Sequence, residues 1–204
     1  MAGGPIAKLS RKEQQELWDD LNYLNTGEIK SFCKQHSIPY RIAIETRDGG
    51  RRSTSHDDRK GVMLDNVRHF LKTGVAPAET RFPADVVCFD PLPQNLTAGD
   101  RLFYGQYDKA NRAMVALLKD LTDGQFKNGA VARILARDFW NSGQAPTFQE
   151  YASAWLRSSN EHTRPNPEWA FLSDRSAKRA SLDWKKLRAA KATEVLKLLR
   201  SITP

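Results

Sequence analysis

The stretch that decides the fold is residues 26–39, which reads TGEIKSFCKQHSIP. Ile29, Phe32 and Cys33 recur at the spacing of three and four that places apolar side chains on one face of an α-helix. The closing Ser-Ile-Pro ends such a helix, because proline cannot continue it and biases the preceding residue towards an extended backbone. The sequence therefore predicts a helix that runs to about His36.

A second stretch with helical spacing lies at residues 59–71 and reads RKGVMLDNVRHFL. Its apolar side chains share one helical face. They are Val62, Met63, Val67, Phe70 and Leu71. The following Thr73-Gly74 supplies the left-handed residue at which helices commonly end. The sequence predicts a helix from about Asp58 to Lys72.

Together the two stretches resemble the SAP domain, a short helix–loop–helix module. In that family the first helix ends in a hydrophobic residue and proline, as at Ile38-Pro39, and the second opens with a basic residue and continues with paired aliphatics, as from Arg59. The resemblance covers about a quarter of the chain. It implies binding of duplex DNA, often AT-rich, through the starts of the helices and their connecting loop. The family's connector is usually a few residues, whereas here 18 residues, Tyr40 to Asp57, separate the helices.

This connector has a pattern of its own. Apolar Tyr40, Ile42 and Ile44 occupy alternate positions, as in an extended strand. The turn signal Asp-Gly-Gly follows, and after it the polar run RRSTSH. We interpret the segment as a mobile basic loop or a small β-hairpin near residues 40–52.

The start of the second SAP-like helix has a physical reason to bind phosphate. A helix N-terminus presents free N–H groups and a partial positive charge, and an arginine-rich loop precedes this one. Such groups contact successive phosphates of a duplex without reading its sequence. The candidate nucleic-acid-binding residues are Arg47, Arg51, Arg52, Arg59, Lys60 and Gly61. The alternative is a solvated polar loop in which Asp48, Asp57 and Asp58 cancel much of the charge.

Further helices are predicted outside this pair. The capping-box pattern S-x-x-E begins at Ser10 and T-x-x-E begins at Thr147. Asp108 and Asn128 are candidate caps for two more helices. A last helix is expected over about 181–202. Its apolar stripe is Trp184, Leu187, Val195, Leu198 and Ile202, with the aliphatic stem of Lys191 laid along it.

These elements predict an all-α fold with at most a minor β-hairpin near residues 40–52. The expected domains are a SAP-like module with an N-terminal helix at 1–80, a connector at 81–106 and a helical C-terminal domain at 107–204.

The charge of the chain favours a polyanionic partner. Its 32 Lys and Arg against 24 Asp and Glu give a net charge of +8. Most of the excess lies in the C-terminal quarter. The auxiliary basic residues proposed for nucleic-acid contact are Lys178, Arg179, Lys185 and Lys186. A basic amphipathic helix also suits a membrane surface or an acidic protein, and its charges can equally be solvated only.

Residues 97–204 further resemble the tail that accompanies SAP domains in bacterial proteins, on stretches such as Phe139-Trp140 and Ala145-Pro146. This resemblance implies a bacterial or phage-borne origin and no mechanism. Aromatic side chains of the tail can stack nucleobases, but at helical spacing they more often form core. They are Phe139, Trp140, Tyr151, Trp155, Trp169, Phe171 and Trp184.

Catalytic patterns are missing from the sequence. None of HExxH, GxSxG, GxxxxGK[ST] or GxGxxG occurs. Cys33 and Cys88 form no CxxC pair or Cys/His cluster, so we expect no disulfide, no metal and no cofactor. No run approaches the roughly 18 apolar residues of a membrane span, and no signal peptide opens the chain, which indicates the cytoplasm.

We therefore expect a non-enzymatic protein that binds nucleic acid, with duplex DNA as the first choice. Two alternatives stay open. One is an interaction adaptor whose helical C-terminal domain recruits a protein partner, and the other is an RNA-binding protein.

Overall fold

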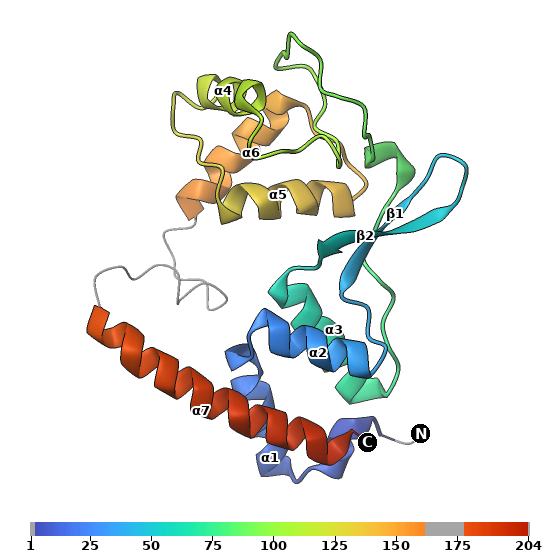
Figure 1. Cartoon of the computed structure of the whole chain (residues 1–204), viewed down its shortest axis with the longest axis vertical. Coiled ribbons are helices and arrows are strands. Elements are labelled where there is room, and N and C mark those ends of the chain that lie inside the picture. Colours follow the sequence, from blue (N-terminus) through green and yellow to red (C-terminus); the bar gives the residue numbers. More distant parts are fainter. Residues whose placement is uncertain (1–2, 162–177, 204) are drawn as a thin grey trace. The chain divides into compact units, whose positions relative to one another are not determined.

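The computed structural model describes residues 3–161 and 178–203, with side chains for 3–159 and 184–203. This part of the chain forms seven α-helices and a three-stranded sheet (Figure 1). The helices are α1 (Arg11–Asp20), α2 (Thr26–Gln35), α3 (Lys60–Thr73), α4 (Arg112–Asp120), α5 (Ala130–Asn141), α6 (Phe148–Glu161) and α7 (Lys178–Ile202). The strands are β1 (Arg41–Glu45), β2 (Arg51–Asp57) and β3 (Arg81–Phe82). Three short 3-10 helices accompany them: η1 (Pro5–Lys8), η2 (Leu21–Tyr23) and η3 (Ala84–Val86).

Local capping signals fix several helix ends where the sequence predicts them. The Ser10 side chain accepts from the N–H of Glu13, and the Glu13 carboxylate accepts from the N–H of Ser10, which closes a capping box at α1. At α6 the N–H of Thr147 donates to Glu150 at 2.7 Å, and the N–H of Glu150 donates to the Thr147 hydroxyl at 3.1 Å. Gly74, at φ 75°, is the left-handed stop of α3.

Two predicted caps are wrong. Helix α4 is capped by Asn111, because Asp108 accepts from the N–H of Ala110 in the preceding turn. Helix α5 begins after Gly129, and the side chain of Asn128 accepts from a tyrosine hydroxyl instead.

The expectation of an all-α fold is also wrong, because the chain contains a mixed sheet in the order β2-β1-β3. The hairpin expected near 40–52 continues to Asp57, and β3 pairs in parallel with β1 so that Ile44 lies opposite Phe82. Short-range patterning reveals neither feature. Strand β2 lies at the sheet edge and has no apolar alternation, and the two residues of β3 are held as a strand by tertiary contact.

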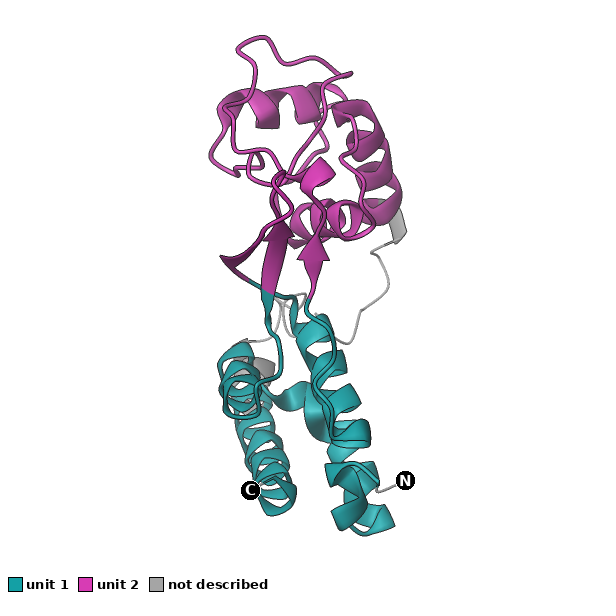
Figure 2. Cartoon of the chain, turned by 90° about the vertical axis from the view of Figure 1, so that its right-hand side faces the viewer, with its two compact units in different colours: residues 1–41, 57–79, 165–204 teal, residues 42–56, 80–164 magenta. Residues whose placement is uncertain are grey.

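The chain forms two compact units that interleave along the sequence (Figure 2). Unit 1 comprises residues 1–41, 57–79 and 165–204, and unit 2 comprises 42–56 and 80–164. The domains expected from the sequence, 1–80, 81–106 and 107–204, are consecutive segments, whereas each compact unit combines separate ones. Periodicity reports which side chains are buried, but not which distant segment covers them.

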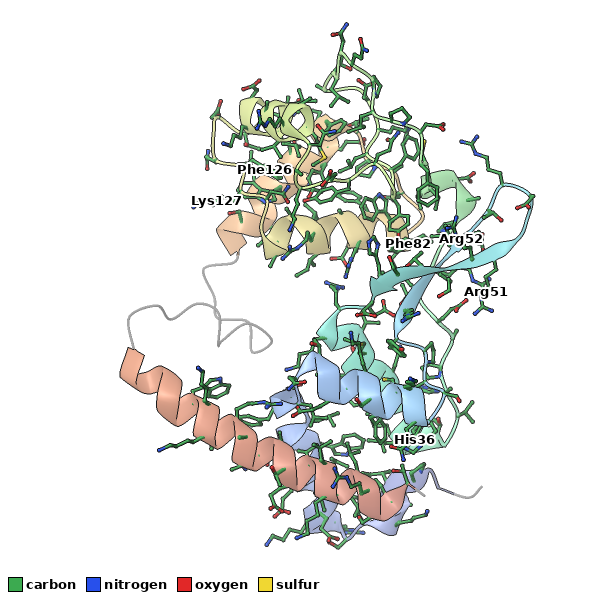
Figure 3. All side chains as sticks on the ribbon, in the orientation of Figure 1. His36, Arg51, Arg52, Phe82, Phe126 and Lys127 are labelled. Carbon is green, nitrogen blue, oxygen red and sulfur yellow. The ribbon has the colours of Figure 1, made fainter. Side chains whose placement is uncertain are left out.

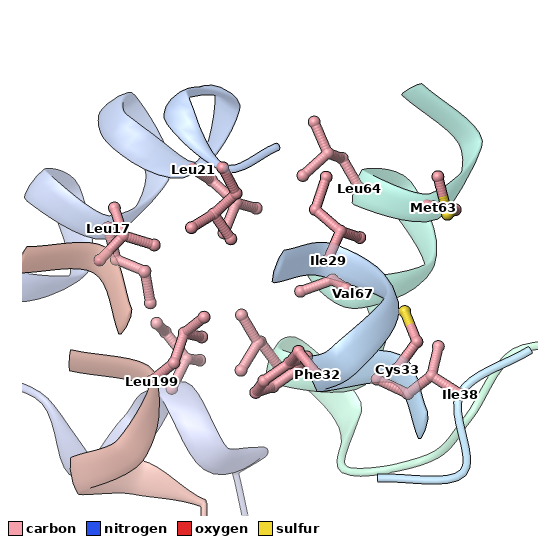
Figure 4. Close-up of a cluster of buried hydrophobic side chains, with 14 of the residues drawn as sticks. Leu17, Leu21, Ile29, Phe32, Cys33, Ile38, Met63, Leu64, Val67 and Leu199 are labelled. Atoms are coloured by element: carbon pink, nitrogen blue, oxygen red, sulfur yellow. The ribbon is translucent and has the colours of Figure 1, made fainter. Parts of the chain in front are cut away.

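Unit 1 is helical, and the pair α2 and α3 shares one core with α1 and α7. Side chains of the pair in this core include Ile29, Phe32, Cys33, Met63, Leu64 and Val67 (Figure 4). Leu17 and Leu21 of α1 and Leu199 of α7 lie in the same cluster. Burial of such side chains is the main favourable contribution to the stability of the unit.

The stripe predicted for α7 is only partly buried. Val195 and Ile202 are in the core, whereas Trp184 and Leu187 are 38% and 46% exposed. Lys191 forms an ion pair with Asp20, with Nζ and Oδ2 2.8 Å apart. None of the described helices is long and apolar enough to cross a membrane.

Unit 2 packs α4, α5, α6 and the sheet around an aromatic core. Ile42 and Ile44 of β1 lie in this core with Phe82 of β3. The aromatic members from outside the sheet are Tyr104, Phe126, Trp140, Phe148, Tyr151 and Trp155. The prediction that the tail aromatics form core is therefore confirmed for Trp140, Tyr151 and Trp155, while Trp169 and Phe171 lie outside the described residues.

Candidate nucleic-acid interface

The β1–β2 hairpin places three predicted arginines together. Arg47 lies in the turn, Arg51 and Arg52 open β2, and all three side chains are exposed. The turn is closed by the N–H of Thr46, which donates to the carbonyl of Gly50 at 3.0 Å.

The carboxylate of Asp48 is engaged within this turn. It accepts from the Thr46 hydroxyl at 2.5 Å and from the N–H of Gly50 at 3.3 Å. These two donors hold the pKa of the Asp48 carboxyl below its ordinary value. Asp48 is therefore ionised and fixed in the turn.

The two hairpin arginines of β2 project to opposite sides of the strand (Figure 3). Because side chains alternate along a strand, Arg52, Thr54 and His56 share one side. On that side the Thr54 hydroxyl donates to the Ile42 carbonyl at 2.8 Å. His56 Nδ1 lies 2.7 Å from the hydroxyl of Tyr104. One side of β2 thus meets the body of unit 2, and the other carries Arg51 with Ser53 and Ser55.

The start of α3 carries the other three predicted residues. Arg59 is the N-cap, with an extended backbone and no side-chain cap hydrogen bond, and the first turn contains no acidic residue. Lys60 Nζ donates to the carbonyl of Asn22 at 2.6 Å. Gly61 lies half-buried in the first turn. The backbone amides here suit an anion, and the ammonium of Lys60 also joins α3 to η2.

The two acidic residues before α3 differ in their surroundings. Asp57 pairs with Lys30, with Nζ and Oδ2 2.8 Å apart. Asp58 is buried, only 6% exposed, and its N–H donates to the carbonyl of Tyr40. Its charge acts on the neighbouring thiol. Burial raises the pKa of Cys33 to about 12, and the negative charge of Asp58 adds to the effect.

The six predicted residues fall into two groups. Arg47, Arg51 and Arg52 belong to unit 2, and the group at the start of α3 belongs to unit 1. The sequence contains no sign that the connector folds with the second half of the chain, so it did not predict that the two groups belong to different units.

Basic residues of α7 divide into those that hold the helix in place and those that face solvent. Arg188 Nε donates to the carbonyl of Tyr23 at 2.9 Å, and its guanidinium pairs with Glu28. Lys185 and Lys186 are exposed. The side chains of Lys178 and Arg179 lie outside the described residues, although both residues belong to α7.

A further group of cationic and aromatic side chains, not predicted from the sequence, lies in unit 2. A pocket of about 250 Å³ is lined by residues that include His56, Tyr104, Tyr107 and Arg133. The lining comes from three places in the sequence, His56, residues 104–109 and residues 133–140, and no motif joins them. Among the described side chains, no group of His, Cys, Asp and Glu is placed to hold a metal ion.

No family model matches the chain, and neither the curated proteins nor the solved structures provide a match. The candidate interface therefore rests on the residues and geometry of this chain.

Proposed function

We propose that this chain is a non-catalytic nucleic-acid-binding protein whose first target is duplex DNA. The observation that carries the proposal is the hairpin. Arg47, Arg51 and Arg52 are exposed on one short antiparallel arm, and the acidic residue of its turn, Asp48, is engaged with Thr46 and Gly50. Exposed arginines on such an arm suit phosphates, which accept paired hydrogen bonds from a guanidinium.

The start of α3 supports a second group of phosphate contacts. Its amides point out of a 14-residue helix with no side-chain cap, and Arg59 and Lys60 flank them. The neighbouring Asp57 is paired with Lys30. Folding of the two SAP-like stretches as the packed helices α2 and α3 is compatible with the DNA binding that the resemblance implies.

The test is a fluorescence-anisotropy titration of the full chain with AT-rich duplex, GC-rich duplex and single-stranded RNA at two salt concentrations. We expect duplex affinity to fall with salt, with a log–log slope of about −0.9 for each phosphate neutralised. The variant Arg47→Ala/Arg51→Ala/Arg52→Ala should reduce the steepness by up to about three such increments. Equal loss for both duplexes would indicate phosphate contact without base readout.

A matched control removes the same charge elsewhere. Lys12, Lys119 and Lys127 are exposed, and their triple alanine variant also lowers the net charge by three. If the control variant weakens duplex binding as much as the hairpin variant does, the net charge alone determines the affinity and the hairpin proposal fails. Tighter binding of RNA than of either duplex would move the function to RNA.

The start of α3 needs a gentler test, because Lys60 also donates to the Asn22 carbonyl. Lys60→Arg keeps the charge and a donor, whereas Arg59→Gln removes the charge at the N-cap. We expect Arg59→Gln to weaken duplex binding and Lys60→Arg to retain it. Unchanged affinity in Arg59→Gln would confine the interface to the hairpin.

A protein partner for α7 is the second candidate function. Trp184 and Leu187 are exposed beside Lys185 and Lys186, and an apolar pair beside two cations suits an acidic, amphipathic segment. Substitution of Trp184 and Leu187 by Ser should leave duplex binding unchanged under the first proposal. Loss of duplex binding would make α7 part of the nucleic-acid surface.

A further inference from the structure

The pocket in unit 2 has an aromatic interior. Tyr104 and Trp140 are almost completely buried, whereas Tyr107 is half-buried and His56 is exposed. The pocket volume of about 250 Å³ lies below the roughly 300–1,000 Å³ typical of sites for drug-sized ligands. Its size therefore suits a single flat ring system, with any larger substituent extending towards the exposed side chains of the lining, Lys109 and Arg133.

The rings are held in fixed positions by one another. The ring centroids of Tyr104 and Trp140 lie 5.5 Å apart at 78°, and those of Tyr107 and Trp140 lie 6.1 Å apart at 77°. His56 meets Tyr104 edge to face at 5.6 Å. Such edge-to-face contacts are favourable aromatic geometries, so the pocket is formed before a ligand arrives.

The polar atoms of these rings are bonded within unit 2. The Tyr107 hydroxyl donates to Asn128 Oδ1 at 2.7 Å, and Trp140 Nε1 donates to the Leu102 carbonyl at 3.0 Å. The Tyr104 hydroxyl is 2.7 Å from His56 Nδ1. A ligand in the pocket therefore meets ring surfaces rather than these polar atoms, and a planar ring that can stack fits best.

Cationic side chains line the same pocket. Lys109 and Arg133 are exposed and Arg137 is half-buried. The carboxylate in the lining, Asp108, accepts from the N–H of Ala110 at 2.9 Å. The pocket thus offers three positive groups against one negative group, which favours an anionic ligand.

The positive charges near the pocket affect the pKa of its two tyrosines, Tyr104 and Tyr107. Burial raises the pKa of Tyr104, and a hydrogen bond with Thr54 and the charges of Arg137 and Arg52 oppose that shift. Burial likewise raises the pKa of Tyr107, opposed by its hydrogen-bonded neighbour Tyr151 and by Arg133. The positive charges of Arg52, Arg133 and Arg137 therefore act on tyrosines that line the pocket.

We propose that this pocket binds one nucleotide, with its base against Tyr107 and His56 over the floor formed by Trp140, and its phosphate beside Lys109 and Arg133. Base–aromatic stacking and cationic contact to phosphate are the two interactions that hold unpaired nucleotides on proteins. The inference rests on the proposed function and extends it, because His56, which lines the pocket, belongs to β2, the strand that also carries Arg51 and Arg52. The ligand is either a free nucleotide or an unstacked nucleotide within a strand.

The test uses the full chain and an NMR titration of the Trp indole N–H signals, with Trp140 assigned from Trp140→Phe. The probes are 5′-dAMP, deoxyadenosine, inorganic phosphate, and a short single strand of deoxyadenosine nucleotides. We expect 5′-dAMP or the single strand to shift the Trp140 signal, and to bind at least tenfold more tightly than deoxyadenosine or phosphate alone. Binding of both 5′-dAMP and the strand indicates a free-nucleotide site, and binding of the strand alone indicates a strand site.

Two sets of variants test the contacts to the phosphate and to the base separately. Lys109→Gln/Arg133→Gln should weaken the nucleotide at least tenfold but leave deoxyadenosine unchanged, whereas the charge-matched control Lys119→Gln/Lys127→Gln should retain binding. Tyr107→Phe keeps the ring and should bind, while Tyr107→Ser should not. Equal loss in the control pair, or no response of Trp140 to either the nucleotide or the strand, overturns the proposal.

The duplex titration is read separately. Duplex binding that depends on the hairpin arginines, without any nucleotide effect at Trp140, leaves the proposed function standing and removes the pocket. A nucleotide effect at Trp140 without duplex binding supports the pocket and contradicts the proposed duplex binding.

Discussion

The hydroxyl of Tyr104 lies 2.7 Å from Nδ1 of His56, and this contact ties strand β2 to the segment that leads into α4. The same tyrosine ring packs on Phe82 of β3 at 5.1 Å and on Trp140 of α5 at 5.5 Å. Tyr104 therefore connects the basic hairpin, the third strand and the aromatic core of unit 2.

Removal of the Tyr104 hydroxyl should destabilise unit 2 modestly. Tyr104→Phe keeps the ring packing and removes one hydrogen bond, so we expect the free energy of unfolding to fall by about 1 kcal/mol. Urea denaturation followed by circular dichroism measures this value. Tyr40→Phe is the control, since the described residues offer its hydroxyl no hydrogen-bond partner. A similar loss in the control would assign the effect to tyrosine substitution in general.

Alkaline pH should destabilise the protein through its buried tyrosines. Burial raises the pKa of Tyr151 and of Tyr104 in the folded state, whereas a tyrosine in the unfolded chain has a pKa of about 10. The stability linked to these groups is fully present below that pH and is lost as the pH rises towards the folded values, since the unfolded chain then binds fewer protons. Urea midpoints at pH 8 and pH 11, with absorbance at 295 nm to follow tyrosinate, test the sign. A midpoint that rises with pH would contradict it.

The two thiols should differ sharply in reactivity. Cys33 is fully buried with a pKa of about 12, and the thiolate is the reactive form. Cys88 is only partly buried. Ellman's reagent at pH 8 should therefore modify Cys88 rapidly and Cys33 only after unfolding. Retention of the fast phase in Cys33→Ala and its loss in Cys88→Ala would assign the phases, and fast labelling of Cys33 would show that the α2–α3 core opens readily.

The end of α3 should depend on a glycine. Gly74 has φ 75°, and an alanine there is strained although its Cβ would meet only an ordinary contact with Pro5 at 3.7 Å. We expect Gly74→Ala to lower the free energy of unfolding by about 1 kcal/mol. Gly99→Ala is the matched control, because its Cβ would lie 3.9 Å from the Thr97 hydroxyl and its φ is not in the left-handed region. Thermal melts of both variants decide the point.

The polar contacts of Arg188 should add to the apolar packing that holds helix α7. This guanidinium donates to the Tyr23 carbonyl and pairs with Glu28, so Arg188→Ala should cost about 1.5 kcal/mol. The exposed Lys186→Ala should change the stability by much less. Equal urea midpoints for the two variants would mean that apolar packing alone holds the helix.

The parts of the fold that the sequence predicts are those fixed by neighbouring residues. Ser10 and Thr147 cap helices because their partners stand three positions away, and Gly74 ends α3 because its own backbone requires it. The sheet is different, since β3 is a strand only through its pairing with β1 across intervening residues. Pattern within a short window contains no information about that pairing.

In the candidate site, too, the sequence predicts what neighbouring residues determine and not what distant residues determine. The hairpin arginines are recognisable in the sequence because they are clustered, but their membership in unit 2 is not. The nucleotide pocket unites His56 with Tyr107 and Arg133, which no spacing rule connects. The exposure of Trp184, predicted as core, likewise depends on which part of α7 meets α1 and η2.

The interleaved segments of unit 1 set an order for folding during synthesis. Every described segment of unit 2 precedes α7 in the chain, so unit 2 can complete its core while the ribosome is still making that helix. The core that contains Leu17 and Leu21 is complete only after Val195 and Leu199 of α7 have been synthesised and packed against them. A nascent chain halted before α7 therefore presents an unfinished apolar surface on its earliest helices.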